Sequence, residues 1–166
     1  MEKIRFDKNN APIVLIGDVI DKLQELKKEN IVIDTIITSP PYWGQRDYGV
    51  KGQMGNEETP EEYIKKMLRV ADNLKEILKE SGSYFLNIGD KYSDKNLQMI
   101  PYKIATEMQK RGWILRNVIM WYKPNHMPSP VKNRFSNTWE PVFFFVKNGE
   151  SKKYYFNLDE VGVKHK

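Results

Sequence analysis

Residues 38–43 read Thr-Ser-Pro-Pro-Tyr-Trp and follow the apolar run IVIDTII. The two prolines fix φ and offer carbonyl oxygens without competing N–H groups, so this stretch can be rigid and still present acceptors. Ser39 adds a hydroxyl, and Tyr42 and Trp43 add flat aromatic faces. Such a set can hold a planar group that carries an amino donor, and a nucleobase is one. The residue types alone leave a second interpretation open, a proline turn whose aromatic rings pack back on the core.

The elements before and after this stretch place it at the carboxyl end of a strand. An apolar run at 12–18 opens an alternation of strands and helices, and the β-branched run 31–38 has the pattern of a strand covered on both faces. The segment 59–81 predicts a helix, because Thr59 and Glu62 form a capping box, Pro60 suits the first helical position, and Gly82 ends it. Its apolar stripe consists of Ile64, Met67, Ala71, Leu74 and Leu78.

The alternation continues with a strand at 83–90, a helix from about 99 to 110, and strands at 113–123 and 140–148. No helix separates the last two strands, so we expect an antiparallel pair at one edge of a mostly parallel α/β sheet. Trp139 and Phe143–Phe145 are predicted to belong to the core. This is a Rossmann-like layout, in which ligands bind beyond the carboxyl ends of the strands.

Composition limits the chemistry and the partners. The formal charge of +5 favours a polyanionic partner, although lysine-rich surfaces also serve solubility. There is no cysteine, which excludes a thiolate nucleophile, and with only two histidines we expect no metal site. No apolar stretch approaches the ~20 residues that span a bilayer, so we expect no membrane contact and a cytoplasmic location.

Several ordered blocks resemble the amino-group DNA methyltransferases, and Ser-Pro-Pro-Tyr is similar to the family's catalytic motif in the form associated with cytosine N4. The other blocks are LIGD, YWGQRDYGVKGQMG, TPEEYIKKM, GSYFLNIGD and WYKPNHMPSPVKNRFSNTWEPVFFFVK. They cover roughly residues 13–148, in the order of the permuted subgroup whose catalytic half comes first. The resemblance implies a Rossmann-like fold dependent on S-adenosyl-L-methionine, acting on double-stranded DNA in restriction–modification.

The resemblance also implies a mechanism. The target base is flipped out of the duplex, and its exocyclic amine attacks the methyl group directly. Carried over to this chain, Ser39 accepts one amino hydrogen, the Pro40 carbonyl accepts the other, and Tyr42 stacks on the base, with Pro41 completing the catalytic motif. The same geometry permits adenine N6 as the target.

Further site residues follow from matching positions. Asp18 matches an acidic residue that contacts the cofactor adenine, with Thr38 and Ser39 also at the cofactor, although Gly-Asp at a strand end is more often a helix cap. For Trp121, Lys123 and Asn125 the alternative to lining the base pocket is a strand-end aromatic beside a solvated lysine, and each basic residue can equally be surface charge. The residues assigned to the base pocket or to DNA are Trp43, Arg46, Trp121, Lys123, Asn125, Lys132 and Arg134.

The chain also departs from the family pattern. Family members of this order continue to a target-recognition region and to an F-x-G-x-G loop that holds the methionine part of the cofactor, and no such loop occurs in these 166 residues. We therefore expect residues 1–166 to form one domain, the catalytic half of a methyltransferase, completed by a complementary chain or by self-association. The strand at 31–38 would then expose an unpaired apolar edge. The alternative is a non-catalytic fragment that binds DNA or a partner.

Overall fold

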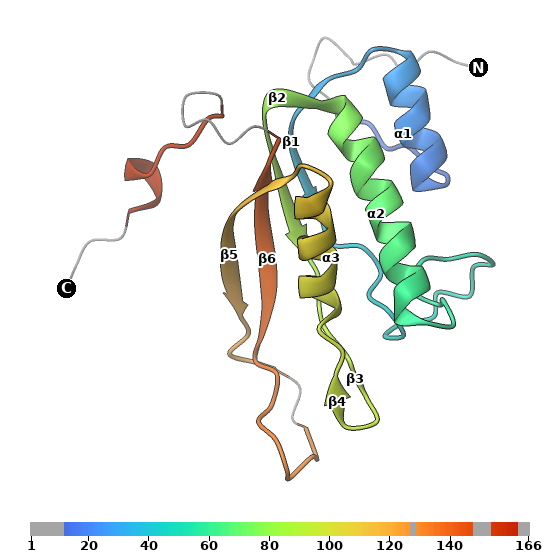
Figure 1. Cartoon of the computed structure of the whole chain (residues 1–166), viewed down its shortest axis with the longest axis vertical. Helices are drawn as coiled ribbons and strands as arrows, with labels where there is room; N and C mark the ends of the chain where they lie inside the picture. The colour runs from blue at the N-terminus through green and yellow to red at the C-terminus, as the bar shows by residue number, and fades with distance from the viewer. Residues whose placement is uncertain (1–11, 127–128, 148–153, 163–166) are drawn as a thin grey trace.

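The computed structural model describes residues 12–126, 129–147 and 154–162. Four strands form one sheet in the order β1-β2-β6-β5, and β3 pairs with β4 in a short hairpin (Figure 1). The strands are β1 Ile33–Thr38, β2 Leu78–Asn87, β3 Tyr92–Ser93, β4 Asn96–Leu97, β5 Ile114–Tyr122 and β6 Trp139–Val146. The helices are α1 Val19–Lys28, α2 Pro60–Ile77, α3 Ile100–Lys110 and the 3-10 turn η1 Asp159–Val161.

The direction of the strands confirms the predicted α/β sheet. β1 and β2 are parallel, whereas β6 runs antiparallel to both β2 and β5. β5 therefore points the same way as β1 and β2, and the β5–β6 pair is the predicted antiparallel hairpin at one edge. The predicted strand at 140–148 ends at Val146 in the structure, and residue 148 lies outside the described residues.

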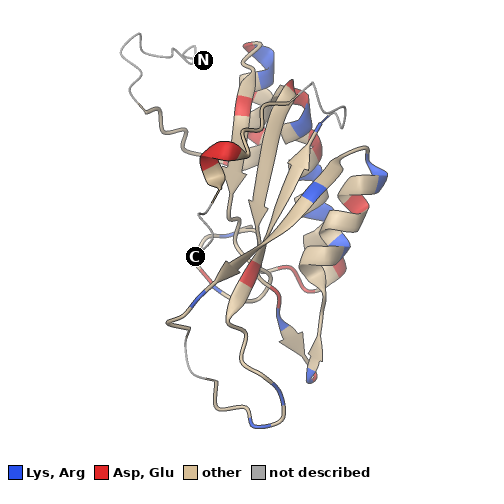
Figure 2. Cartoon of the chain, turned by 90° about the vertical axis from the view of Figure 1, so that its left-hand side faces the viewer, with Lys and Arg blue, Asp and Glu red and all other residues tan. Residues whose placement is uncertain are grey.

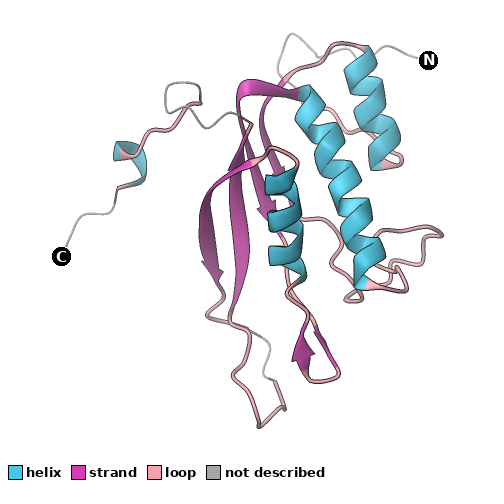
Figure 3. Cartoon of the chain, viewed as in Figure 1, coloured by secondary structure: helices cyan, strands magenta, loops and turns pink. Residues whose placement is uncertain are grey.

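One face of the sheet carries the core. All three α-helices lie on the same side of the sheet (Figure 3). Alternate residues of the two central strands pack against them and are almost fully buried, because successive side chains of a strand point to opposite faces. These sheet residues are Tyr84, Leu86, Phe143 and Phe145, and they meet the buried stripe of α2 and residues of α3 such as Ile104 and Met108.

The other face has no α-helix over it among the described residues, so the prediction that β1 is covered on both faces is wrong. Ile37 is 76% exposed, while Ile36, on the helix side, is buried. Phe144 is covered on the open face by stacking on Phe85, at 4.7 Å between ring centroids, and on Phe156, at 6.0 Å. β1 is also an edge strand, as predicted.

Three further predictions need correction, and in each case long-range packing overrides a local pattern. The helix α2 ends at Ile77 rather than near Gly82, because Leu78 already pairs with Ile33 as the first residue of β2. The apolar run 12–18 forms no strand, since none of the strands in the described residues pairs with it to complete its backbone hydrogen bonds. Trp139 is 38% exposed, because it pairs with Tyr122 at the far end of the edge hairpin.

The start of α2 and the extent of α3 are confirmed. Thr59 is the N-cap of α2, and its Oγ1 accepts a hydrogen bond from the backbone N–H of Glu62 at 3.3 Å. Pro60 occupies the first turn, where its missing N–H has no cost. Within the described ranges, no helix combines the length and apolar character that a membrane crossing requires.

The packing predicts which side chain the fold depends on. Replacing Phe143, which is fully buried between the sheet and α3, with alanine should lower the free energy of unfolding by about 3 to 5 kcal/mol. The matched control is Tyr155→Ala on the open surface, which should change it by less than about 0.5 kcal/mol. Urea titration followed by circular dichroism measures both, and equal stabilities would contradict the assigned core.

Candidate active site

The strands β1, β2 and β5 run in the same direction, so their carboxyl ends lie at the same end of the sheet. The turn 39–43 follows β1, Asn87 ends β2, and Lys123 follows β5. β6 runs the other way, so its first residues, Trp139 and Glu140, reach the same end. Residues far apart in the sequence are therefore brought together where an α/β sheet offers its ligand site.

The hydroxyl of Tyr42 is the centre of this cluster. Its Oη lies 2.8 Å from Oδ1 of Asn87, 3.1 Å from Oε2 of Glu140 and 3.2 Å from Oγ of Ser39. Glu140 in turn forms an ion pair with the Nζ of Lys123. The Tyr42 hydroxyl thus connects the turn after β1 to the end of β2 and to the start of β6. Through Glu140 it is also connected to Lys123, which follows β5.

The ring of Tyr42 rests against the backbone of Gly89. A Cβ at this glycine would lie 2.7 Å from Cε2 of the ring, so only glycine leaves the ring in this place. The pKa of Tyr42 is raised to about 12. Burial is the largest cause, the hydrogen bond with Ser39 acts in the opposite direction, and the negative charge of Glu140 also raises the pKa. The phenol is therefore a neutral hydroxyl group at physiological pH.

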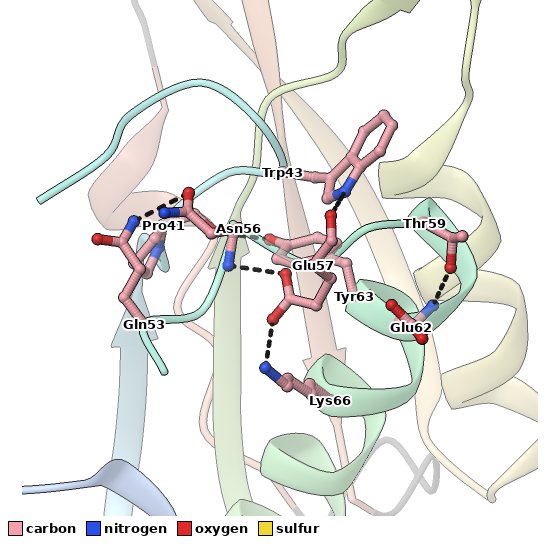
Figure 4. A network of polar contacts seen from close by, with 10 residues as sticks. Pro41, Trp43, Gln53, Asn56, Glu57, Thr59, Glu62, Tyr63 and Lys66 are labelled. Atoms are coloured by element: carbon pink, nitrogen blue, oxygen red, sulfur yellow. Dashed lines mark hydrogen bonds and ion pairs between the residues drawn. The ribbon is translucent and has the colours of Figure 1, made fainter. Parts of the chain in front are cut away.

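Contacts from α2 and from the loop before it hold the proline turn from behind (Figure 4). Tyr63, which is fully buried, donates a hydrogen bond from Oη to the Pro41 carbonyl at 2.9 Å. The indole N–H of Trp43 donates to the Glu57 carbonyl at 2.9 Å, and the buried carboxylate of Glu57 pairs with Lys66 at 2.8 Å. The two prolines are thus fixed from two sides while Ser39 stays exposed.

A glycine with positive φ closes this loop onto the turn. Gly55 has φ +100°, and a Cβ there would lie 2.9 Å from the Tyr42 carbonyl oxygen. Its own carbonyl accepts the N–H of Gly44 at 2.7 Å. A side chain at residue 55 would push the loop away from the turn.

The structure brings some of the predicted residues together. Lys123 joins the Tyr42 network through Glu140, and Trp121 lies directly opposite Glu140 in the β5–β6 register. The Nζ of Lys91 lies over the ring of Trp43, 5.0 Å from the ring centroid. Each of these residues lies near the turn that the sequence identified.

Other predicted residues lie elsewhere or face away. Thr38 turns to the helix-covered side, where its Oγ1 lies 3.0 Å from Oη of Tyr84. Asp18 caps α1, because its Oδ1 accepts the N–H groups of Ile20 and Asp21 at 2.9 and 3.4 Å. The predicted cofactor contacts of both residues stay predictions.

The predicted phosphate ligands lie on two loops. Arg46 is exposed in the loop that follows β1, and Asn125, a residue predicted for the base pocket, is exposed in the loop that follows β5. Lys132 is exposed in the loop between β5 and β6, and the guanidinium of Arg134 lies 4.0 Å from the ring centroid of Tyr92. In Figure 2 basic residues mark this loop, which extends from the same edge of the sheet as the Tyr42 cluster. No three histidine or acidic residues cluster as a metal site in the described part of the chain, and His165 lies outside it.

Sequence reasoning missed the polar partners of Tyr42. Asn87 lies 45 residues and Glu140 98 residues from Tyr42 along the chain, and neither forms a local motif with it. A polar residue inside the otherwise apolar part of the predicted strand 83–90 was a usable signal for Asn87, because that strand neighbours the one before the motif. Glu140 carried no comparable signal.

Comparison with known proteins agrees with this geometry. The family model described as DNA methylase matches residues 33–166. This chain belongs to the DNA methylase family. It is 51% identical over 142 residues to the Type II methyltransferase M.MwoI of Methanothermobacter wolfeii, covering 83% of this chain and 21% of that protein. It is 39% identical over 167 residues to M.SfiI of Streptomyces fimbriatus, covering 90% of this chain and 38% of that protein.

Solved structures show the same fold. The PvuII DNA methyltransferase, titled cytosine-N4-specific, superimposes with a TM-score of 0.65 at 26% identity, over 80% of this chain and 48% of that one. A DNA modification methylase from Thermus thermophilus in complex with S-adenosyl-L-methionine gives a TM-score of 0.62 at 23% identity, over 83% and 56%. The chain therefore has the fold of the S-adenosylmethionine-dependent methyltransferases, and it spans less than two thirds of the length of these relatives.

The pKa of Tyr42 predicts a dependence of stability on pH. Below about pH 10 the phenol is protonated in both the folded and the unfolded chain, so it adds no slope. Between about pH 10 and about pH 12 the unfolded chain releases this proton first, so stability falls as pH rises. Urea titrations across this range should show a steeper fall for the natural chain than for Tyr42→Phe, and identical slopes would contradict the burial of this hydroxyl.

Proposed function

We propose that this chain forms the catalytic, base-binding half of a DNA methyltransferase that modifies the exocyclic N4 amine of cytosine. The observation that carries the proposal is the rigid Ser39–Tyr42 turn at the carboxyl end of β1, tied to β2 and β6 through one hydroxyl. The PvuII neighbour, which its title describes as cytosine-N4-specific, supports cytosine as the target. The relatives named Type II methyltransferases support double-stranded DNA as the substrate and restriction–modification as the setting.

The proposed roles follow from the chemistry of an aromatic amine. Its lone pair is delocalised into the ring, so it is a poor nucleophile until acceptors draw on both of its hydrogens. Ser39 Oγ accepts one hydrogen and the Pro40 carbonyl the other, while Tyr63 keeps the neighbouring Pro41 carbonyl fixed. Holding the flipped base in line for attack is a class of effect worth up to about 7 to 11 kcal/mol.

S-adenosylmethionine supplies an electrophilic methyl group when it is bound. The described residues fit one side of such a cofactor. Asp18 is exposed and uses only Oδ1 for its cap, which leaves its second carboxylate oxygen for a polar group of the adenosine part. Thr38 and Ser39 would border it with their backbone at the end of β1. Contacts to the methionine part then fall to a segment beyond the described residues.

The base pocket and the DNA backbone have separate candidate residues. Trp43 in the turn, Trp121 near the end of β5, and Lys123 and Asn125 just after β5 are proposed to line the pocket of the flipped base. Arg46, Lys132 and Arg134 are proposed to hold phosphates, which would make binding weaken with salt. Arg46 lies on the loop after β1. Lys132 and Arg134 lie on the loop between β5, which ends at the site, and β6, which begins there.

We further propose that a complementary cofactor-binding half covers the open side of the sheet. No strand of the described residues pairs with the outer edge of β1, and natural proteins rarely leave such an edge uncovered. Val32, just before β1, and Ile37, within it, are both exposed. In Figure 2 most Lys, Arg, Asp and Glu residues lie on the helices and loops, and the strands carry only a few. The match covers 48% of the PvuII enzyme, so that enzyme has further residues to which the matched part of this chain does not correspond.

Replacing Ser39 tests the catalytic role. In the completed enzyme, Ser39→Ala should lower the turnover number by about one hundredfold or more, because the amine loses a fixed acceptor, while affinity for S-adenosylmethionine changes little. Incorporation of labelled methyl groups into duplex DNA measures the rate, and mass spectrometry of the released nucleosides separates N4-methylcytosine from N6-methyladenine. Ser81→Ala, on an exposed part of β2, is the control. Undiminished turnover in Ser39→Ala would remove this residue from its role.

Replacing Ile37 tests the proposed interface. Ile37→Lys places a charge on the open face of β1, so it should abolish pairing with a separate chain that consists of the M.MwoI residues outside the matched region. The isolated fold should tolerate it, because Ile37 is exposed there. Val161→Lys, on the exposed 3-10 turn, is the control. Sedimentation measures the complex, and a self-associated chain would show as a dimer without the M.MwoI chain. Low-micromolar cofactor binding and DNA methylation by the isolated monomer would contradict the proposal.

A further inference from the structure

The hydrogen bonds around Tyr42 determine which way the Ser39 hydroxyl donates. A phenol has one hydrogen to donate, and three oxygens lie within hydrogen-bond distance of Tyr42 Oη, those of Asn87, Glu140 and Ser39. If Tyr42 donates to Asn87 or to Glu140, it has no hydrogen left for Ser39. The hydrogen between Ser39 and Tyr42 must then belong to Ser39.

Glu140 determines whether Ser39 donates a hydrogen to Tyr42 or accepts one from it. Its carboxylate forms an ion pair with Lys123, and the oxygens of a carboxylate accept hydrogen bonds. The amide of Asn87 does not change the outcome. With its oxygen toward Tyr42 it competes with Glu140 for the phenol hydrogen, and with its nitrogen toward Tyr42 it leaves that hydrogen to Glu140.

We infer that Glu140 is a positioning residue that sets the direction of the Ser39 hydroxyl. Through Tyr42 it draws the Ser39 hydrogen inward, so the lone pairs of Oγ face outward, where they can accept a hydrogen from the target amine. With the reverse direction, Ser39 would point its own hydrogen at the amine and could not activate it. This inference rests on the proposed function of Ser39 and adds Glu140 to the residues on which that function depends.

The strand order supports the inference. β6 lies between β2 and β5, so Glu140 stands between Asn87 at the end of β2 and Lys123 after β5. The Lys123 N–H also donates to the Thr138 carbonyl at 2.6 Å, which ties both ends of the β5–β6 loop together. Strand pairing therefore fixes the backbone positions from which the Glu140 and Lys123 side chains meet.

The first experiment uses the isolated chain and needs no activity. Nuclear magnetic resonance of tyrosine labelled with carbon-13 at Cζ follows the ionisation of Tyr42, whose signal is identified by its absence in Tyr42→Phe. Glu140→Gln should lower the Tyr42 pKa, because the carboxylate charge that disfavours the phenolate is gone. Glu76→Gln removes the same charge from the surface ion pair with Lys27 and is the matched control. An unchanged Tyr42 pKa in Glu140→Gln would overturn the assigned contact.

The second experiment measures single-turnover methylation in the completed enzyme. Glu140→Gln should slow it by about 10- to 100-fold, with affinity for S-adenosylmethionine unchanged, because the amide can donate to Tyr42 and reverse the Ser39 hydroxyl. In a Ser39→Ala background the same substitution should cost nothing more, since no hydroxyl remains to be turned. Glu76→Gln should leave the rate unchanged in both backgrounds.

The outcomes separate the inference from the proposed function. Full activity in Ser39→Ala would overturn the role of Ser39 itself and, with it, this inference. Loss of activity in Ser39→Ala with full activity in Glu140→Gln, or equal losses from Glu140→Gln in both backgrounds, would overturn the role of Glu140 alone. If Glu140→Gln unfolds, Tyr42→Phe provides the second variant: it should slow the reaction in the natural background and not in Ser39→Ala, and full activity would overturn the inference.

Discussion

The antiparallel insertion of β6 between β2 and β5 is the constraint on which the rest of this structure depends. It buries Phe143 and Phe145 at the centre of the helix-covered face, where they meet Tyr84 and residues of α3. Because β6 runs against its neighbours, its first residues lie at the carboxyl ends of the other strands. The same strand therefore supplies the middle of the core and, through Glu140, the innermost polar group of the site.

The elements that the sequence predicts well are those with complete local signals. The start of α2 combines a cap, a proline and an apolar stripe, and the structure confirms each of them. The sequence fails where the deciding contact is distant. Leu78 continues the stripe of α2 and still begins a strand, because Ile33 lies beside it in the parallel ladder. The continuous apolarity of β1 likewise predicts two covered faces, and only the fold reveals that one face is open.

The candidate site also has a part that local sequence predicts and a part that depends on distant contacts. The turn at Ser39 is visible in the sequence because proline, hydroxyl and aromatic residues are adjacent there. Its support is not visible, since Tyr63, Asn87 and Glu140 reach it from three separate elements. A sequence motif can identify the groups that face a substrate. The direction in which a hydroxyl donates depends on partners that no motif contains.

The Tyr42 network lies next to the exposed end of β1, and this proximity has a physical consequence. The Tyr42 network is completed within the described residues, with its ion pair and hydrogen bonds formed between strands. Ser39, which is hydrogen-bonded to Tyr42, is exposed at the end of β1, and no strand among the described residues pairs with the outer side of β1. The acceptor is thus oriented before anything covers it, so a segment docking against β1 would need to add only the opposite wall. Such a segment would raise the strength of the Ser39 hydrogen bond by excluding water, without having to create its direction.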